Sequence, residues 1–140
     1  MKWFFDTSVL IPVFMEDHEH HEASLTAFIH ADKKQACCAA HSLAELYSVL
    51  TRLPGNRLSG EQVLLFLEAI EEHLTVIALD SREYYSAIRE AAASGIVGGM
   101  LYDALLARCA RKAAAEVIYT WNVQHFRRLG PEVANRTKTP

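Results

Sequence analysis

Apolar residues follow two spacings along this chain, and each spacing predicts one kind of element. Short apolar runs are typical of buried strands, and they predict strands over 2–5, 35–40, 74–79 and 117–120. Apolar residues that recur every three to four positions predict helices. The predicted helices cover 8–15, 21–30, 42–52, 59–73, 81–94 and 101–115, with one more short helix inside the loop 121–129.

Serine and glycine mark where several helices begin and end. Ser59 and Ser81 are predicted N-caps, because a serine hydroxyl accepts a hydrogen bond from the free N–H groups of a first turn. Gly95 is the predicted stop of the second of these helices. Strands that alternate with helices predict an α/β fold with a central parallel sheet of four to five strands flanked by helices. No repeat or linker divides the sequence, so we expect one domain over 1–140.

The composition is that of a globular protein, which we expect in the cytoplasm. Hydrophobic residues make up 51% of the chain and charged residues 22%. No apolar run reaches the roughly 18 residues of a membrane span, and the start lacks the features of a signal peptide, so no membrane contact is expected. The chain has no CxxC pair and an odd number of cysteines, and Cys37 and Cys38 are predicted to be packed, reduced residues.

Charge is unevenly distributed along the chain, although the net charge is only -3. Residues 105–140 contain seven basic and two acidic residues, whereas residues 1–104 contain seven basic and fifteen acidic residues. A basic C-terminal part could contact phosphates while acids elsewhere hold a metal. Ordinary solvated helix faces would give the same asymmetry. The candidate phosphate contacts are Arg108, Arg111, Arg127 and Arg128.

Two polar residues follow predicted strands, where ligands bind in parallel sheets. Asp6 ends the first strand and Asn122 follows the fourth, so both are expected at the carboxyl edge of the sheet. Asp6 could cap the next helix or bind a metal, since Thr7 or Ser8 could provide the cap in its place. Asn122 could supply an oxygen ligand or complete a turn.

Two further carboxylates have both a structural and a functional interpretation. Ser42-x-x-Glu45 fits a capping box, which the sequence alone favours, although a cap and a site role can coexist. Asp103 lies in the first turn of its helix, where it suits the helix dipole, but its apolar neighbours would require a cation or hydrogen bonds as partners. The histidines of the polar segment 16–22 match no standard metal site and are predicted to lie in a solvated loop: His18, His20 and His21.

Four segments, taken in order, resemble the PIN-domain family and specifically its VapC-type toxin ribonucleases. The segments are FDTSVL (5–10), SLAEL (42–46), YDALLA (102–107) and TWNVQHF (120–126), and they span nearly the whole chain. The resemblance implies a parallel sheet flanked by helices, a bound Mg²⁺ or Mn²⁺, and endonucleolytic cleavage of RNA. It also implies a cognate antitoxin as partner, and often a homodimer.

The resemblance assigns the family's acidic positions to Asp6, Glu45 and Asp103. A fourth position, commonly Asp, corresponds to Asn122, which lowers the charge and argues against tight binding of a second metal. Thr120 matches the hydroxyl residue found beside the site. The chemistry agrees, because Mg²⁺ prefers oxygen ligands, keeps several waters and needs only one or two direct carboxylates.

Three other interpretations remain open. A PIN-like domain without catalysis would bind RNA or protein, although the presence of all three acids counts against it. A haloacid-dehalogenase-like phosphatase needs an Asp two residues after its nucleophile, where this chain has Ser8. A purely regulatory or structural α/β domain would show no metal-dependent cleavage of RNA.

Overall fold

Five parallel strands form the centre of the computed structural model, which describes residues 1–140. Their spatial order is β3-β2-β1-β4-β5, with β1 in the middle. Phe4 of β1 lies opposite Cys37 of β2 on one side and Ile118 of β4 on the other. The parallel sheet predicted from the sequence is therefore confirmed. The strands are β1 (Trp3–Phe5), β2 (Ala36–Ala39), β3 (Thr75–Ile77), β4 (Val117–Tyr119) and β5 (Thr137–Lys138).

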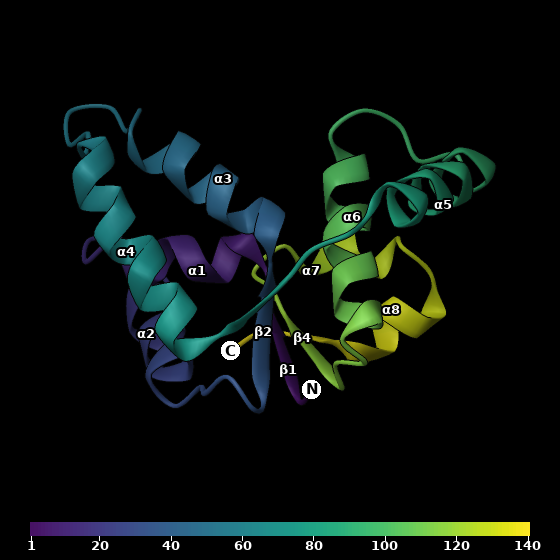
Figure 1. The fold of residues 1–140 in the computed structure, drawn as a ribbon, viewed down its shortest axis with the longest axis horizontal. Helices are drawn as coiled ribbons and strands as arrows, with labels where there is room; N and C mark the ends of the chain where they lie inside the picture. The colour runs from purple at the N-terminus through teal and green to yellow at the C-terminus, as the bar shows by residue number, and fades with distance from the viewer.

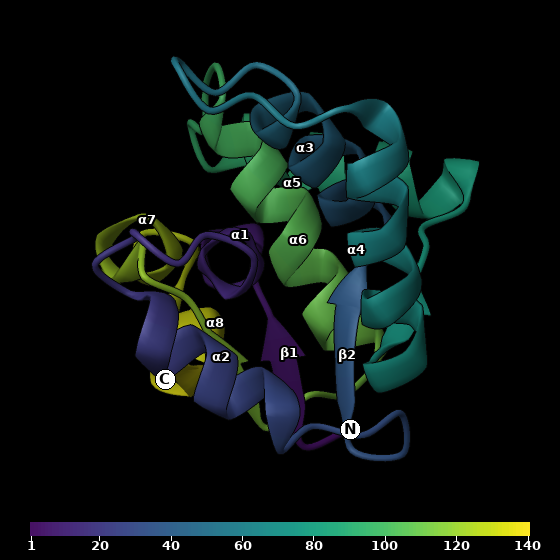
Figure 2. The same cartoon turned by 90° about the vertical axis from the view of Figure 1, so that its left-hand side faces the viewer.

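Eight helices cover the two faces of the sheet. Helices α1 to α4 lie on one side and α5 to α8 on the other (Figure 1), and β1 and β2 run in the same direction in the view from the side of the first group (Figure 2). Every predicted helix is present, with ends that differ by up to three residues. The helices are α1 (Thr7–Val13), α2 (His21–Ile29), α3 (Ala40–Leu50), α4 (Gly60–His73), α5 (Ser81–Ala93), α6 (Met100–Lys112), α7 (Val123–Arg127) and α8 (Pro131–Arg136).

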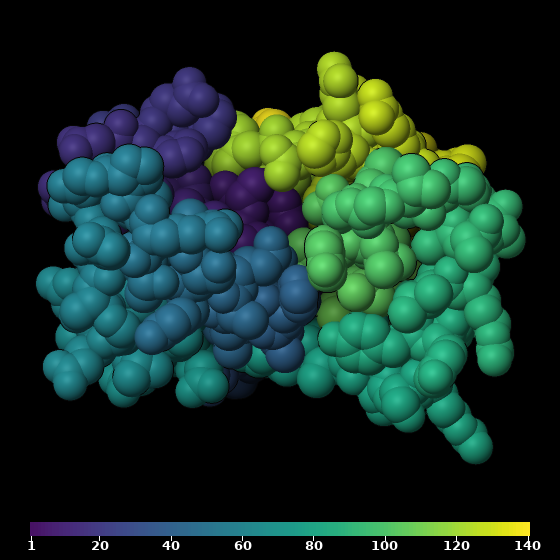
Figure 3. Space-filling model, turned by 90° about the horizontal axis from the view of Figure 1, so that it is seen from above, coloured from purple at the N-terminus to yellow at the C-terminus, as the bar shows by residue number.

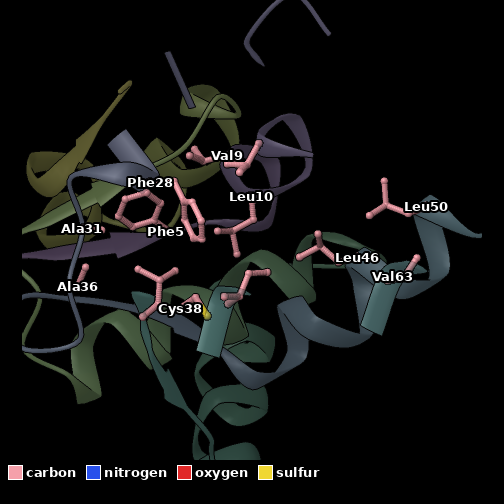
Figure 4. Packing of buried hydrophobic residues seen from close by; sticks show 13 residues of the cluster. Phe5, Val9, Leu10, Phe28, Ala31, Ala36, Cys38, Leu46, Leu50 and Val63 are labelled. Atoms are coloured by element: carbon pink, nitrogen blue, oxygen red, sulfur yellow. The ribbon is translucent and has the colours of Figure 1, made fainter. Parts of the chain in front are cut away.

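Each face of the sheet has its own apolar core, because successive strand residues point to opposite sides. Phe5 and Cys38 belong to a cluster of 13 buried residues that includes side chains of α1 to α4 (Figure 4). Phe4 and Cys37 belong to a cluster of 10 on the other face, with side chains of α6 and α7. All three cysteines, including Cys109, are buried and unpaired, and burial raises the pKa of the Cys37 and Cys38 thiols to about 12. The prediction that Cys37 and Cys38 are packing residues is confirmed.

One predicted helix cap is confirmed and another is wrong. Ser59 caps α4, because its Oγ accepts a hydrogen bond from the Gln62 N–H at 3.2 Å, and Gln62 Oε1 in turn accepts from the Ser59 N–H at 2.9 Å. Ser81 is not the cap of α5. Asp80, one residue earlier, takes that position, and its Oδ1 accepts from the Glu83 N–H at 2.9 Å. The carboxylate of Asp80, and not the Ser81 hydroxyl, therefore caps the first turn of α5.

The ends of α5 and α6 differ in how clearly the sequence marks them. Gly95 follows α5 with φ of +73°, the left-handed conformation predicted for it. Helix α6 was predicted to reach residue 115, but it ends at Lys112. Ala114 takes φ of +52° there, and the Ala115 N–H donates back to the Ala110 carbonyl at 2.9 Å. Glycine usually takes this left-handed conformation at a helix end. Here an alanine takes it, so the sequence contains no signal for the end of α6.

Residues 130–140 add α8 and β5 beyond the last predicted element. Thr137 of β5 lies opposite Ile118 of β4, which makes β5 the fifth strand and one edge of the sheet. None of the helices is long and apolar enough to cross a lipid bilayer.

Candidate active site

The order of the strands reverses between β1 and β4. From β1 the chain moves outward through β2 and β3, and it then returns to β4 on the other side of β1. Ligands of open parallel sheets bind at such a switch point, outside the carboxyl ends of the strands. Asp6 follows β1 and Thr120 follows β4. Seen from above, the N-terminal segment (purple) forms the floor of a hollow between segments around α3, α6 and α7 (Figure 3).

Asp6 directly follows β1 and is only 2% exposed. It is the N-cap of α1, so the structural interpretation is realised and neither Thr7 nor Ser8 replaces it as cap. Its Oδ2 accepts hydrogen bonds from the Ser8 N–H at 3.4 Å, the Ser8 hydroxyl at 2.7 Å and the Thr120 hydroxyl at 2.7 Å. Because both hydroxyls bind Oδ2, neither occupies Oδ1, and a cap and a cation could use different oxygens.

The two hydroxyls are oriented by backbone groups of the segment after β4. The Trp121 N–H donates to Ser8 Oγ at 2.9 Å, and the Asn122 N–H donates to Thr120 Oγ1 at 2.9 Å. Each hydroxyl oxygen therefore accepts from the backbone and directs its single proton to Asp6. The sequence-based prediction included Thr120 but missed Ser8. The only signal for Ser8 was its place in Asp-Thr-Ser, which also suits an ordinary helix start.

Glu45 lies on α3, in the first turns after β2. Its Oε1 accepts from the Thr7 hydroxyl at 3.1 Å, and His41 Nε2 lies 3.6 Å from the same oxygen. The predicted capping box with Ser42 is wrong. Helix α3 begins at Ala40 directly after the strand, so Ser42 is already inside the helix, where it is buried with its Oγ 2.7 Å from Thr7 Oγ1. Glu45 is therefore not used as a cap.

Asp103 lies in the first turn of α6, as predicted. His125 of α7 approaches it, with Nδ1 3.4 Å from Asp103 Oδ2. Asn122 is exposed at the start of α7, and its side chain makes no capping hydrogen bond. Its side-chain amide therefore makes no hydrogen bond that the fold requires.

Burial and mutual repulsion disfavour the negative charges of the three acids. Burial raises the pKa of Asp6, against the hydrogen bonds from Ser8 and Thr120. Burial also raises the pKa of Glu45, and the charge of Asp6 adds to the effect. The pKa of Asp103 rises to about 6, first through burial and then through the charges of Asp6 and Glu45. The charge of Asp6 thus raises the pKa of both other acids. The hydrogen bonds from Ser8, Thr120 and Thr7, together with His41 and His125, lower the three pKa values.

The donor set fits a hydrated, oxygen-preferring cation better than a preformed metal cage. No three His, Cys, Asp or Glu side chains are grouped closely enough to enclose a metal by themselves. Zinc and other metals that prefer nitrogen or sulfur have no such cluster here. Mg²⁺ needs only one or two direct carboxylates and keeps several waters. It therefore suits carboxylates that are too far apart to bind one ion directly together.

The four arginines predicted near RNA fall into two groups. Arg108 pairs with Glu90 and donates to Ser86 Oγ at 3.1 Å, and Arg111 lies 3.7 Å from Glu90 and 3.9 Å from Glu132. These pairs join α6 to α5 and α8. By contrast, the other two arginines lie at the C-terminal end of α7, Arg127 as its last residue and Arg128 as its C-cap. Both are exposed and make no ion pair within the chain.

The sequence profile of the PIN domain matches residues 3–130. The chain belongs to the PIN-domain family. Ribonuclease VapC27 of Mycobacterium tuberculosis is 38% identical over 113 residues, which cover 80% of this chain and 79% of the relative. Ribonuclease VapC40 of the same species is 36% identical over 114 residues, 81% of each chain. Within the PIN-domain family, this chain is therefore of the VapC type.

Solved structures of VapC proteins share the fold of this PIN domain at low sequence identity. VapC20 of M. tuberculosis, described as a toxin that cleaves the sarcin-ricin loop, has a TM-score of 0.72 at 14% identity and covers 89% of this chain and 92% of its own. Chains of DNA-bound VapBC from Salmonella typhimurium and of Rickettsia felis VapBC2 bound to a promoter fragment have TM-scores of 0.68 and 0.66, at 22% and 18% identity. Both cover 99% of this chain and 98% of their own.

Proposed function

We propose that this PIN domain is a metal-dependent endoribonuclease and the toxin of a toxin–antitoxin pair. The observation that carries the proposal is the set of contacts at the switch point of the sheet. The Thr120 hydroxyl donates to Asp6, the Thr7 hydroxyl donates to Glu45, and His125 of α7 approaches Asp103. The burial of Asp6 and the partial burial of Glu45 and Asp103 disfavour their negative charges, and a divalent cation would remove that cost. The names of its relatives, ribonucleases VapC27 and VapC40, give the reaction class.

We assign each acid a part in holding Mg²⁺ or Mn²⁺. Asp6 would present Oδ1 to the cation, because Ser8 and Thr120 hold its other oxygen. Glu45 is steadied by Thr7, and Asp103 lies against His125. Such an ion, when bound, polarises a phosphate oxygen and lowers the pKa of a bound water. Asn122 would contribute a neutral amide oxygen.

The RNA substrate would approach from the side of α7. Arg127 and Arg128 are exposed there without acidic partners, and α7 begins directly after the Thr120 segment. Their positive charge would hold the phosphate backbone beside an otherwise acidic site. Arg108 and Arg111, already paired with Glu90, would contribute less.

A cognate antitoxin is the proposed protein partner. Two of the structural neighbours are described as VapBC bound to DNA, which links this fold to a two-component assembly. We propose that such a partner masks the site, that the toxin forms a homodimer, and that it works in the cytoplasm, where its unpaired thiols stay reduced. Co-expression with any small protein encoded beside this chain, followed by light scattering of the purified material, would test the partner and the dimer.

The decisive test is Asp6→Asn. The amide oxygen can keep the hydrogen bonds of Ser8 and Thr120, and Asn caps helices about as well as Asp. The NH₂ group would then occupy the place of Oδ1 and repel a cation. We expect RNA cleavage with Mg²⁺ or Mn²⁺ to fall about 100-fold or more while circular dichroism stays unchanged.

Two results would contradict the proposal. Full activity of folded Asp6→Asn protein, or wild-type activity that survives thorough chelation, would exclude the metal mechanism. RNA binding by a wild-type protein that never cleaves would favour the alternative, a catalytically inactive PIN-like binding domain.

A further inference from the structure

Two aromatic rings stack on each other across the rim of the candidate site. His41 of α3 and Tyr102 of α6 have ring centroids 5.3 Å apart and planes only 6° from parallel. Tyr102 is 52% exposed, and the His41 side chain is 31% exposed. The two helices lie on opposite faces of the sheet, so this stack joins the two layers of helices (Figure 1).

The stack is adjacent to two of the three acids. His41 Nε2 lies 3.6 Å from Glu45 Oε1, and Tyr102 directly precedes Asp103 in the first turn of α6. A group that bound against these rings would therefore lie next to the place where a scissile phosphate meets the acids.

The stack of His41 on Tyr102 is not explained by core packing. In this it differs from a second aromatic pair, His20 and Trp121. His20 stacks on Trp121 at 3.7 Å, but Trp121 also packs against the larger core, and its indole N–H donates to the buried Ser24 hydroxyl at 2.9 Å. That pair therefore fixes the segment after β4, and His20 is packed rather than solvated as the sequence had suggested. Tyr102 belongs to neither core cluster and is more than half exposed.

We propose that the His41–Tyr102 stack is a nucleobase-binding subsite, which holds an unpaired base of the RNA next to the scissile phosphate. The inference rests on the proposed ribonuclease function. Single-stranded bases bind proteins chiefly by stacking on aromatic and histidine rings, and stacking needs no charge. This matters at a site whose acids repel phosphates until a cation is bound. The subsite selects for an unpaired nucleotide more than for one particular base, because every base has a stacking face.

The test compares substitutions of Tyr102 in cleavage of two matched RNAs, in which the nucleotide beside the cut is unpaired in one and base-paired in the other. Tyr102→Ala should raise KM by about 5- to 100-fold, with a smaller change in kcat, and should weaken the preference for an unpaired nucleotide beside the cut. Tyr102→Phe and Tyr102→Trp should restore both, because they keep the ring. Tyr85→Ala is the matched control, since Tyr85 is 64% exposed on α5. His41 is left unchanged because it also contacts Glu45.

A binding measurement separates this inference from the proposed function. RNA containing 2-aminopurine is titrated into Asp6→Asn protein in the presence of Mg²⁺, with and without the added Tyr102→Ala change. Loss of fluorescence quenching with the alanine, and its return with Trp, would support the subsite even if the wild-type protein cleaved nothing. Equal quenching by both proteins, absence of quenching by either, or an unchanged KM for Tyr102→Ala in an active enzyme would overturn it.

Discussion

Asp6 combines a helix cap with a charge that the fold itself does not neutralise. The cap uses Oδ2, which also accepts the Ser8 and Thr120 hydroxyls, and these bonds offset only part of the cost of burying the carboxylate. Burial also disfavours the charge of Asp103, which has fewer hydrogen bonds than Asp6. The charge of Asp6 raises the pKa of Asp103 further, and only His125 lowers it. The acids therefore destabilise the metal-free protein.

Asp103→Asn should stabilise the metal-free protein while abolishing cleavage. An acid with a raised pKa keeps its proton more tightly in the folded state than in the unfolded state, so its stability cost grows as pH rises from about 4 to about 6 and is complete at pH 7. Asn cannot ionise and avoids this cost. Urea denaturation at pH 7 should show a gain of about 1 to 3 kcal/mol in the free energy of unfolding.

The matched control is Glu116→Gln, since Glu116 is exposed and lies in no ion pair. It should change the free energy of unfolding by less than about 0.5 kcal/mol. A lower stability of Asp103→Asn than of wild type would mean that the carboxylate has a structural partner that outweighs its repulsion.

Asn122→Asp should tighten binding of Mg²⁺. The residue is exposed and its side chain makes no capping hydrogen bond, so the change adds one negative charge at the start of α7 with little effect on packing. Calorimetric titration with MgCl₂ should give a Kd several-fold lower than that of wild type. Weaker binding by the folded variant would refute the view that the neutral amide limits the charge of the site.

The positions of the acids could be predicted from the sequence more readily than the side chains that contact them. Asp6 and Asp103 could be predicted because they stand at a strand end and a helix start, and such positions can be recognised locally. Ser8 was missed because its role depends on Thr120 and the Trp121 N–H, which lie 112 and 113 residues away. The role of His41 likewise depends on a ring from another helix.

At the scale of elements, errors arose where the local signal and the three-dimensional path disagree. Ser42 looks like a cap, but β2 continues directly into α3, and Ala39 takes the cap position without any side-chain hydrogen bond. Ala114 ends α6 without a glycine, which no composition rule detects. Residues 130–140 form two elements too short to show a periodicity, and β5 exists because β4 offers it a free edge.

We expect the arginines at the end of α7 to bind RNA and those of α6 to stabilise the fold. Replacing Arg127 and Arg128 by alanine should weaken RNA binding at all sequences and reduce the salt slope by about one per lost phosphate contact, without unfolding. Arg108→Ala should instead lower the free energy of unfolding by about 0.5 to 1.5 kcal/mol, because it breaks the link from α6 to Glu90 and Ser86 of α5. Filter binding between 50 and 200 mM salt would measure the first effect. An unchanged slope in the double variant would count against α7 as the RNA contact.

At the scale of the whole molecule, the candidate site joins two layers that have separate cores. Asp6 and Glu45 come from helices on one face of the sheet, and Asp103 comes from α6 on the other. The strand and helix pattern was enough to predict the parallel sheet and its carboxyl edge. It could not predict which helices lie on which face, because that depends on the strand order. Repulsion among the acids acts between the two layers, so a cation between them should stabilise the molecule as a whole.

This coupling predicts that stabilisation by Mg²⁺ grows with pH. Between about pH 4 and 6 the raised pKa of Asp103 keeps part of the site protonated, and protons compete with the cation. At pH 7 the acids are charged, so their repulsion is greatest and the cation binds best. With Mg²⁺ at about 100 times its Kd, linkage gives about 2.7 kcal/mol of added stability.

Thermal unfolding at pH 5 and pH 7, with and without MgCl₂, measures this effect as the difference between paired samples. Groups elsewhere in the chain contribute equally to both members of each pair. The increase in Tm should be clearly larger at pH 7, and Asp6→Asn should lose most of it at both pH values. An increase of the same size at both pH values, or one that persists in Asp6→Asn, would show that Mg²⁺ stabilises the protein at another place and not through the acids that join its two layers.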